Sequence, residues 1–310
     1  MGRKVLITGG AGFIGSTLCR HALKAGWTVS VLDDLSNGHL ENIEELDVDI
    51  HVGSILDTAA VDSAMENADA VVHLAALGSV PRSIADPITT HLTNATGTLA
   101  VLEAVRRNEV RYVAAASSSS VYGKNPETPK RETQWVGPLS PYAVSKLCTE
   151  HYVLAYQTSF NLSTLALRLF NVYGPRQRAG HAYAAVVPRF THALMTGSPL
   201  EVYGDGFQSR DFTYVDTVSA VFLSAINQSI THPQPVNLAF GTNTTLNQLI
   251  TTLEEETGIQ APIKYLDPRP GDVPHSLGDG HQLQQLFPEV EPVPLNRGIG
   301  DTLDWFRRQP

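Results

Sequence analysis

The sequence has few cysteines, fewer basic than acidic residues, and no apolar run of membrane-spanning length. Only two cysteines occur, Cys19 and Cys148, and their wide separation argues against a disulfide scaffold and against metal-ligand spacing, so no bound metal is predicted. A reducing cytoplasm is the expected location. The 22 basic and 31 acidic residues give a formal charge of −9, which argues against nucleic acid or an anionic membrane as partner. The apolar runs are all shorter than the ~20 residues that a bilayer-spanning helix needs.

The composition is that of a globular protein with a large core. Of the 310 residues, 42% are hydrophobic and 17% are charged, and the length corresponds to about two domains. The sequence changes character after residue 170, where glycine, proline and loop arginines become frequent. We therefore expect a first domain over residues 1–170, with a later return of the chain near 215–245, and a smaller second domain over 171–310.

The first half alternates short apolar runs with helical patterns, which indicates repeated β-α units. The runs contain Val, Ile, Leu and Ala at nearly every position, as in strands that helices cover on both faces. Strands are expected at Lys4–Thr8, Val29–Asp33, Ile50–Gly53, Ala70–Ala75, Tyr112–Ser117 and Thr164–Phe170, and helices near 13–25, 57–66, 88–107 and 141–160. The predicted fold class is α/β, with a doubly wound parallel sheet.

A glycine-rich turn joins the first predicted strand to the first predicted helix. Gly9, Gly12 and Gly15 allow a tight turn and the close approach of a pyrophosphate to the helix N-terminus. The second strand ends in Asp33, at roughly the 20-residue spacing where a carboxylate accepts from the ribose 2′-hydroxyl of NAD. No arginine follows Asp33, so NAD is favoured over NADP. The alternative is a tight strand-to-helix turn that binds nothing.

Tyr142 and Lys146 stand four residues apart in a predicted helix, hence on one face and one turn apart. Such a pair can belong to any amphipathic helix, but four serines at 117–120 precede it at a strand end, which faces the ligand crevice in open α/β sheets. A phenol with a pKa near 10 needs ~4 kcal/mol of stabilisation to lose its proton near pH 7. The Lys146 ammonium and the positive ring of NAD⁺ have the right sign to supply it.

The glycine turn, Tyr142-x-x-x-Lys146 and the serine-rich strand together resemble the extended short-chain dehydrogenase/reductase family, and more narrowly its NAD-dependent nucleotide-sugar epimerases and dehydratases. The resemblance covers essentially the whole chain. It implies a Rossmann domain, a UDP-sugar substrate, catalysis by Ser118, Tyr142 and Lys146, and a homodimer that pairs helices 88–107 and 141–160. The cofactor contacts, from the turn and the resemblance together, are Gly9, Gly12, Phe13, Ile14, Gly15, Asp33, Ser36, Asn37, Gly38, Ser54, Ile55, Leu74, Ala75, Ala76, Asn94, Tyr142, Lys146 and Phe170.

The residues after Ser118 discriminate between the reactions of this family. Its dehydratases carry Asp-Glu directly after the catalytic hydroxyl residue, and its decarboxylases carry Glu two residues after it, whereas this chain has Ser119 and Ser120. Serine hydroxyls do not accept protons at neutral pH, so elimination lacks its acid and base. Epimerisation at C4 needs only Tyr142 and the cofactor, and it is the predicted reaction.

Arginines in the second half are candidates for holding a diphosphate, because its two negative charges call for guanidinium groups. The pattern of the second half resembles bacterial UDP-N-acetylglucosamine 4-epimerases. Ser276 stands where glucose-restricted relatives carry tyrosine, which leaves room for a 2-acetamido group. The substrate contacts that this resemblance implies are Gly78, Ser79, Ser118, Ser119, Asn171, Gln177, Ala185, Val187, Tyr203, Gln208, Arg210, Arg269, Asp272 and Ser276.

Arg178 keeps a second substrate class open. The N-acetyl-type enzymes usually carry aspartate at this position, whereas a related group of epimerases uses an arginine there to hold the carboxylate of UDP-glucuronate. The predicted substrate is a neutral UDP-hexose, namely UDP-GlcNAc/UDP-GalNAc or UDP-glucose/UDP-galactose, with UDP-glucuronate as the alternative. A non-catalytic NAD-binding regulator and a dehydrogenase with exchangeable cofactor are the remaining alternatives.

Overall fold

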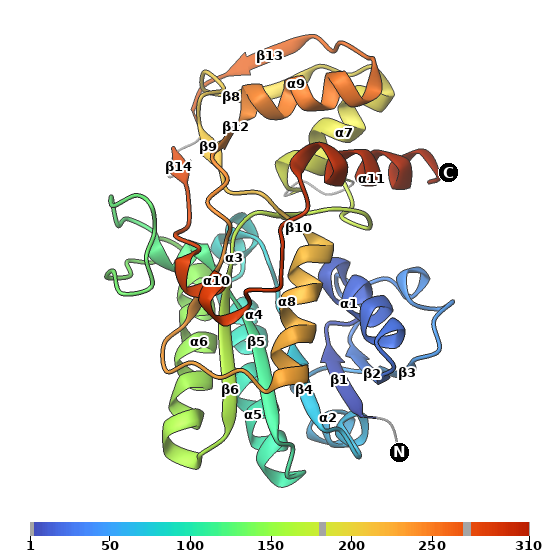
Figure 1. The fold of residues 1–310 in the computed structure, drawn as a ribbon, viewed down its shortest axis with the longest axis vertical. Coiled ribbons are helices and arrows are strands. Elements are labelled where there is room, and N and C mark those ends of the chain that lie inside the picture. Colours follow the sequence, from blue (N-terminus) through green and yellow to red (C-terminus); the bar gives the residue numbers. More distant parts are fainter. Residues whose placement is uncertain (1–2, 180–183, 269–273, 310) are drawn as a thin grey trace.

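A seven-stranded parallel sheet runs through the lower part of the molecule in Figure 1. The computed structural model describes residues 3–179, 184–268 and 274–309. Across the sheet the strands are β11 (Val236–Leu238), β6 (Ser163–Leu169), β5 (Tyr112–Ser118), β4 (Ala70–His73), β1 (Lys4–Thr8), β2 (Thr28–Asp33) and β3 (Asp49–Val52). The chain builds outward from β1 in one direction and then continues through β4 in the other, so the switch point lies between these strands. The predicted doubly wound α/β sheet is confirmed.

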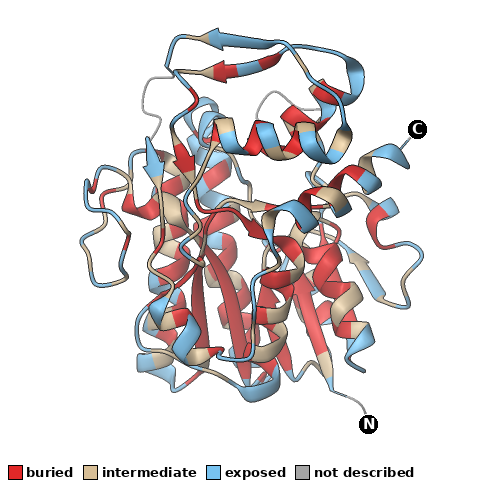
Figure 2. Cartoon of the chain, turned by 45° about the horizontal axis from the view of Figure 1, so that its top comes forward, coloured by how far each residue is buried: buried red, intermediate tan, exposed pale blue. Residues whose placement is uncertain are grey.

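Helices cover both faces of this sheet. They are α1 (Phe13–Lys24) and α8 (Val215–Gln228) on one face, and α2 (Thr58–Met65), α5 (Gly97–Arg107) and α6 (Pro141–Phe160) on the other. Buried side chains of each strand alternate between the two layers, with Val5 and Ile7 in one core and Leu6 in the other. Figure 2 shows the strands buried between the helices, which explains why their sequences are apolar at nearly every position.

Two of these elements come from the second half of the chain. α8 contacts α1 and β5, and β11 extends the sheet by pairing Val236 with Leu167 and Leu238 with Leu169. Residues around 215–240 therefore lie with the first half of the chain in space.

The segment from 80 to 107 is more interrupted than the single helix predicted near 88–107. The chain forms α3 (Val80–Ala85), α4 (Pro87–His91), a π-helical turn η2 (Leu92–Thr96) and then α5. α4 begins where it does because Asp86 accepts a hydrogen bond from the Thr89 N–H and Pro87 occupies the first turn. The π-helical turn buries Asn94 between α6 and the loop that follows β4, and no short sequence pattern signals such a turn.

Apart from residues 281–287, which pack against β11, most of the rest of the second half forms the upper part of Figure 1 around its own core. Its larger elements are α7 (Val186–Thr196), β8 (Leu200–Tyr203), α9 (Leu246–Thr257), β13 (Ile263–Leu266) and α11 (Leu295–Arg307). The short elements of the chain are η1 (Leu40–Asn42), η3 (Ser119–Tyr122), β7 (Val172–Tyr173), β9 (Ser209–Arg210), β10 (Thr213–Tyr214), β12 (Thr244–Thr245), β14 (His275–Ser276) and α10 (His281–Leu286).

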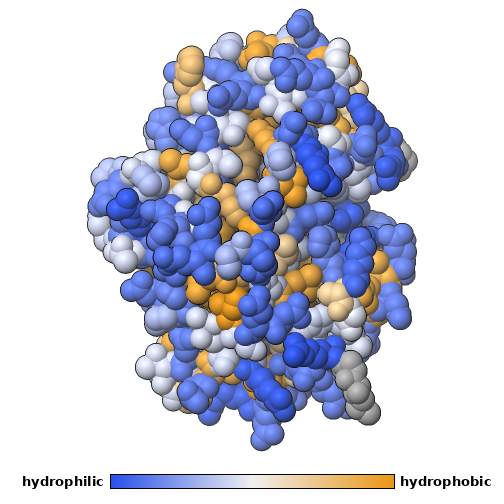
Figure 3. Space-filling model, in the orientation of Figure 1, coloured by the Kyte–Doolittle hydropathy of each residue, from blue (hydrophilic) through white to orange (hydrophobic). Residues whose placement is uncertain are grey.

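The surface is mostly hydrophilic on the face drawn in Figure 3, with apolar residues gathered where the upper and lower parts meet. Both cysteines are free thiols, with Cys19 buried and Cys148 half-buried. None of the helices in the described part of the chain is long and apolar enough to cross a membrane.

Candidate active site

The turn between β1 and α1 can be built only from glycine at two positions. Gly9 has φ +74°, and a Cβ there would lie 2.8 Å from the backbone nitrogen of Ala75. A Cβ on Gly15 would overlap the carbonyl oxygen of Gly9. The N-cap of α1 is Gly12, which offers no side-chain hydrogen bond, so the first N–H groups of the helix stay available to an anion.

A cleft of about 340 Å³ opens over this turn, and we call it the glycine-turn cleft. It collects most of the predicted cofactor residues from the carboxyl ends of the strands, namely Gly9, Gly12, Phe13, Ile14, Gly15, Asp33, Ser36, Asn37, Gly38, Ile55, Leu74, Ala75 and Ala76. Sequence reasoning missed six further residues of its lining, which are Leu32, Asp34, Gly53, Leu77, Thr93 and Ala116. Five of them directly flank predicted positions, including Thr93 of the π-helical turn next to Asn94, and Ala116 lies two residues before the end of β5.

Asp33 shapes the far end of this cleft. Its carboxylate accepts backbone hydrogen bonds from Ala11 and Leu35, both at 2.9 Å, and burial is the main cause that raises its pKa. A Cβ on Gly38 would lie 2.6 Å from one oxygen of this carboxylate, so glycine keeps the acid accessible from the cleft. A cleft with a bare helix N-terminus at one end and a carboxylate at the other fits the pyrophosphate and ribose of NAD.

Five predicted cofactor residues are not among those that line this cleft; Tyr142 and Lys146 are described below, and the other three are Asn94, Ser54 and Phe170. Asn94 is buried. Its amide oxygen accepts from the Leu77 N–H at 2.7 Å, and its amide nitrogen donates to the Leu77 carbonyl at 3.1 Å and to the Ser145 hydroxyl. It therefore positions a loop of the cleft from behind. Ser54 accepts a hydrogen bond from the Leu56 N–H, and Phe170 is fully buried with its ring centroid 6.3 Å from that of Tyr122.

Ser118, Tyr142 and Lys146 come together where β5 ends and α6 begins. Ser140 caps α6 by accepting from the Ala143 N–H at 3.1 Å, and Pro141 starts the helix, so Tyr142 lies in the first turn. Burial raises the pKa of the Tyr142 phenol, and a hydrogen bond with Ser118 acts in the opposite direction. The next serines form η3, in which the buried hydroxyl of Ser120 has no partner within the described residues.

Lys146 is a buried cation one turn along α6. It is 4% exposed, and burial lowers its pKa to about 8, against an opposing effect of Glu150. A phenol, a hydroxyl and an ammonium at one strand end are suited to transferring a proton to and from a substrate hydroxyl.

A second cleft of about 270 Å³ lies in the upper part, and we call it the upper cleft. Seven predicted substrate residues line it, namely Asn171, Gln177, Ala185, Val187, Tyr203, Gln208 and Arg210. Nine lining residues were not predicted, namely Val172, Tyr173, Ala184, Val186, Arg189, Phe190, Glu201, Phe212 and Leu246. Arg189 lies 3.7 Å from Glu201, and its guanidinium is 5.8 Å from the centroid of the Tyr203 ring. The sequence signal that could have pointed to Arg189 is a charged residue next to Phe190 in a mostly apolar helix.

The remaining predicted substrate residues lie outside the lining of the upper cleft. Gly78 lines the glycine-turn cleft, and Ser79 caps α3 by accepting from the Arg82 N–H. Ser276 pairs with Arg210 in the register of β14 and β9, which places it beside a residue of the upper cleft. Ser118 and Ser119 lie at the end of β5, and Arg269 and Asp272 fall outside the described residues.

A hydrogen bond and an ion pair link the segment after β2 to other parts of the chain. Arg82 of α3 donates to Asn37 at 2.7 Å, and Arg178 forms an ion pair with Glu41 of η1, also at 2.7 Å. The Arg178 side chain is 41% exposed, pairs with Glu41 and is not among the residues that line the upper cleft.

Comparisons with known proteins agree with this geometry. Residues 5–239 match the model of the NAD dependent epimerase/dehydratase family. The chain is similar to UDP-glucose 4-epimerase of Mycolicibacterium smegmatis, at 35% identity over 312 residues that cover 99% of each chain. It is also similar to UDP-N-acetyl-alpha-D-glucosaminuronate decarboxylase of Bacillus cytotoxicus, at 31% identity over 320 residues, 99% of this chain and 98% of the relative.

The chain is also similar to solved structures that contain bound ligands. UDP-N-acetylglucosamine 4-epimerase from Methanobrevibacter ruminantium M1, in complex with UDP-N-acetylmuramic acid, superposes with a TM-score of 0.93 at 35% identity, covering 99% of this chain and 98% of that one. MoeE5, in complex with UDP-glucuronic acid and NAD, superposes with a TM-score of 0.87 at 32% identity, covering 98% and 99%.

Proposed function

The chain belongs to the NAD dependent epimerase/dehydratase family, and we propose that it uses its NAD to invert C4 of a UDP-sugar. The observation that carries the choice of reaction is the end of β5. Ser118 contacts Tyr142 there, and the two positions that follow are serines in η3, so the acids that the family's dehydratases and decarboxylases carry at these two positions are replaced by hydroxyls. A phenol, with a buried ammonium one turn away, is sufficient for epimerisation.

The side chains divide the work as follows. NAD, when bound, supplies a hydride acceptor at C4 that also gives the hydride back. Tyr142 takes the proton of the 4-hydroxyl as that carbon is oxidised. It returns the proton after the oxidised sugar has rotated and presents the other face of C4. The Lys146 ammonium stabilises the phenolate, and the Ser118 hydroxyl holds the phenol oxygen in place.

We assign the nucleoside diphosphate to the upper cleft. Arg210 and Arg189 bring positive charge to its lining, and Tyr203 offers a ring face beside Arg189. We further propose, from the resemblance described above, that Arg269 binds the diphosphate and that Asp272 accepts from a ribose hydroxyl. A neutral UDP-hexose is the favoured substrate, because Asn171, Gln177 and Ala185 line this cleft and Arg178 does not.

Proton NMR of the purified protein with UDP-GlcNAc, UDP-glucose and UDP-glucuronate in turn tests this function directly. We expect the C4-epimer of at least one sugar to accumulate to equilibrium without net formation of NADH. Net NADH would indicate a dehydrogenase with exchangeable cofactor. Bound NAD without turnover of any UDP-sugar would favour the non-catalytic regulator.

Arg178→Ala decides between the substrate classes. UDP-glucuronate is the second candidate, because Arg178 matches the carboxylate-binding position and MoeE5 binds that sugar nucleotide. Since Arg178 pairs with Glu41 at the surface, we expect its removal to change kcat/KM for all three sugar nucleotides by less than about twofold, as for exposed ion pairs generally. Glu41→Gln breaks the same pair and should match it. A loss of ~10-fold or more for UDP-glucuronate alone, in Arg178→Ala but not Glu41→Gln, would establish the second candidate.

Asp33 is expected to exclude NADP. The 2′-phosphate would meet the carboxylate that the Ala11 and Leu35 N–H groups hold in place, and no arginine follows in the sequence to neutralise it. Protein stripped of cofactor should therefore regain activity with NAD⁺ and not with NADP⁺ at the same concentration. Equal reactivation by both would refute this role of Asp33.

We also propose that two copies of the chain pair through the segments 88–107 and 141–160, as the resemblance implies, with α3 beside them, since α3, α4 and α6 contact one another. Apolar side chains are exposed along these segments, at Val80, Ile84, Ile88, Leu92 and Val144, with Ile84 65% and Ile88 69% exposed. Ile88→Asp should convert a dimer to a monomer in sedimentation velocity, whereas Ile263→Asp on exposed β13 should not. A monomeric wild type would overturn the proposal.

A further inference from the structure

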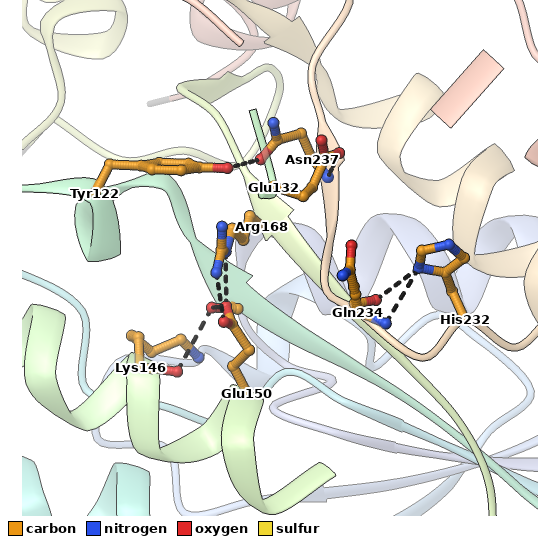
Figure 4. Close-up of polar contacts among 9 residues, drawn as sticks. Tyr122, Glu132, Lys146, Glu150, Arg168, His232, Gln234 and Asn237 are labelled. Atoms are coloured by element: carbon orange, nitrogen blue, oxygen red, sulfur yellow. Dashed lines mark hydrogen bonds and ion pairs between the residues drawn. The ribbon is translucent and has the colours of Figure 1, made fainter. Parts of the chain in front are cut away.

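A buried ion pair lies directly behind Lys146. Glu150 follows Lys146 by one turn on α6, and Arg168 reaches it from β6 with two hydrogen bonds, of 2.8 Å from Nε and 2.6 Å from Nη2. Both side chains are almost completely buried, at 4% and 1% exposure for Arg168 and Glu150. Figure 4 shows the guanidinium and the carboxylate facing each other between α6 and the sheet.

The pair is fixed from several sides. Ser117, next to Ser118 on β5, donates to Glu150 at 2.9 Å. The Arg168 guanidinium lies 4.7 Å from the centroid of the Tyr122 ring, and the Tyr122 hydroxyl donates to Asn237 at 2.7 Å (Figure 4). Each group that holds Glu150 thus comes from a different strand or turn, and the carboxylate has little freedom to move.

Stability alone does not account for such a pair. Taking two charges out of water costs about as much as their attraction returns, so apolar residues of similar volume often serve the fold equally well. Here the carboxylate lies one helical turn from a buried ammonium, where its charge opposes the loss of the Lys146 proton that burial favours.

We infer that Glu150, held by Arg168 and Ser117, is a positioning residue whose local charge sets the proton affinity of both Lys146 and Tyr142. This inference rests on the proposed function, since it concerns the proton that Tyr142 exchanges with the sugar. It adds two residues to those that govern the reaction, Glu150 on α6 and Arg168 on β6, and neither contacts substrate or cofactor in the proposed site.

The other groups around Lys146 do not supply the same charge. Tyr142 shares its helix face, and Ser117 and Ser118 face it from β5 as neutral hydroxyls. His73 comes from β4 between the Thr8 and Thr98 hydroxyls, and burial followed by the Lys146 charge lowers its pKa to about 3, so it is neutral near pH 7. Tyr122 faces Arg168 from η3, and burial raises its pKa to about 12, so it is also neutral.

Opposite substitutions in the pair should move the pH dependence in opposite directions. Glu150→Gln leaves an unpaired Arg168 cation, which disfavours every positive charge nearby and favours the phenolate, so the pKa values of Lys146 and Tyr142 both fall. Arg168→Met leaves the Glu150 carboxylate alone, so both pKa values rise. The double variant Glu150→Gln/Arg168→Met has no net charge, and both values should return close to those of the wild type.

The experiment is the pH profile of kcat for the wild type, the two single variants and the double variant, each with its NAD. We expect both limbs of the profile to shift by about one pH unit, downward in Glu150→Gln and upward in Arg168→Met. Asp62→Asn breaks an exposed pair with Arg107 between α2 and α5 and should leave the limbs in place. Limbs that stay fixed in all four proteins, or move in the same direction in both single variants, would overturn the inference.

A second measurement separates this inference from the proposed function. The Tyr142 phenol can be titrated by ultraviolet difference spectra between each protein and its Tyr142→Phe counterpart, without any sugar. Opposite shifts in this titration, with no turnover of any UDP-sugar, would retain the inference and reject the function. Unshifted titrations in single variants that do epimerise would reject the inference alone. If one single variant fails to fold, the other supplies this comparison, because its shift has its own expected direction.

Discussion

Replacing Tyr142 with phenylalanine is expected to reduce turnover by about 10²–10⁴-fold while the fold and the bound NAD are retained, which is the usual effect of losing a positioned acid–base group. The substitution removes only the hydroxyl that contacts Ser118, and the ring stays in the first turn of α6. The measurement is the rate of epimer formation by NMR, with cofactor content read from the absorbance of the denatured protein.

Tyr152→Phe provides the matched control, because Tyr152 stands on the same helix with its side chain exposed. It should leave turnover unchanged. Ser118→Ala should cost less than Tyr142→Phe, since Ser119 and Ser120 bring further hydroxyls to the same strand end. Activity of Tyr142→Phe within threefold of the wild type would remove Tyr142 from the mechanism.

The second large effect is expected for Gly15→Ala, which should lose most of its bound cofactor. The new methyl group would overlap the Gly9 carbonyl oxygen and lie 2.7 Å from the Gly10 Cα, and both contacts are with backbone. The turn must open to accept it, which moves the α1 N-terminus away from the place where a pyrophosphate would bind. We expect the purified variant to contain less than about a tenth of the NAD of the wild type, with activity reduced in proportion.

Gly300→Ala is the control for adding a methyl group to a helical glycine. Gly300 lies in α11, and its Cβ would come no closer than 3.5 Å to the Glu256 carboxylate, an ordinary contact. Alanine is the better helix former by about 1 kcal/mol, so this variant should bind NAD normally and unfold at the same or a higher temperature. Normal NAD content in Gly15→Ala would contradict the assignment of the glycine turn to the cofactor.

Local signals allowed the first half of the fold to be predicted closely. The helix expected at 141–160 is α6, Pro141–Phe160, because Ser140 caps one end and Asn161, at φ 53°, ends the other. The six strands expected in this half are observed, with ends shifted by at most two residues. Five of them are largely buried and nearly continuous in apolar residues, as expected for strands covered on both faces, whereas the edge strand β3 is mostly exposed. The glycine turn was also readable, since its constraints act within a few residues.

Features that depend on distant partners were not predictable. The partner of Arg178 is Glu41, which lies 137 residues away in sequence, and the partner of Arg168 is buried on a helix that reads as ordinary. Arg189 joins the upper cleft only because β8 folds back beside α7 and places Glu201 next to it. In each case the charge alone is visible in the sequence, and the contact that gives it a role is created by tertiary structure.

The position of β11 has a consequence for how the protein is made. β6 ends at Leu169 and its outer neighbour β11 ends at Leu238, so about 70 residues are synthesised between them, which takes roughly 4–14 seconds. During that interval β6, whose Leu165 and Leu167 are fully buried in the finished molecule, is an open sheet edge with unpaired backbone groups. α8, which later covers α1, is also still missing. A growing chain therefore passes through a period in which it can aggregate or engage a chaperone, and the speed of translation determines how long that period lasts.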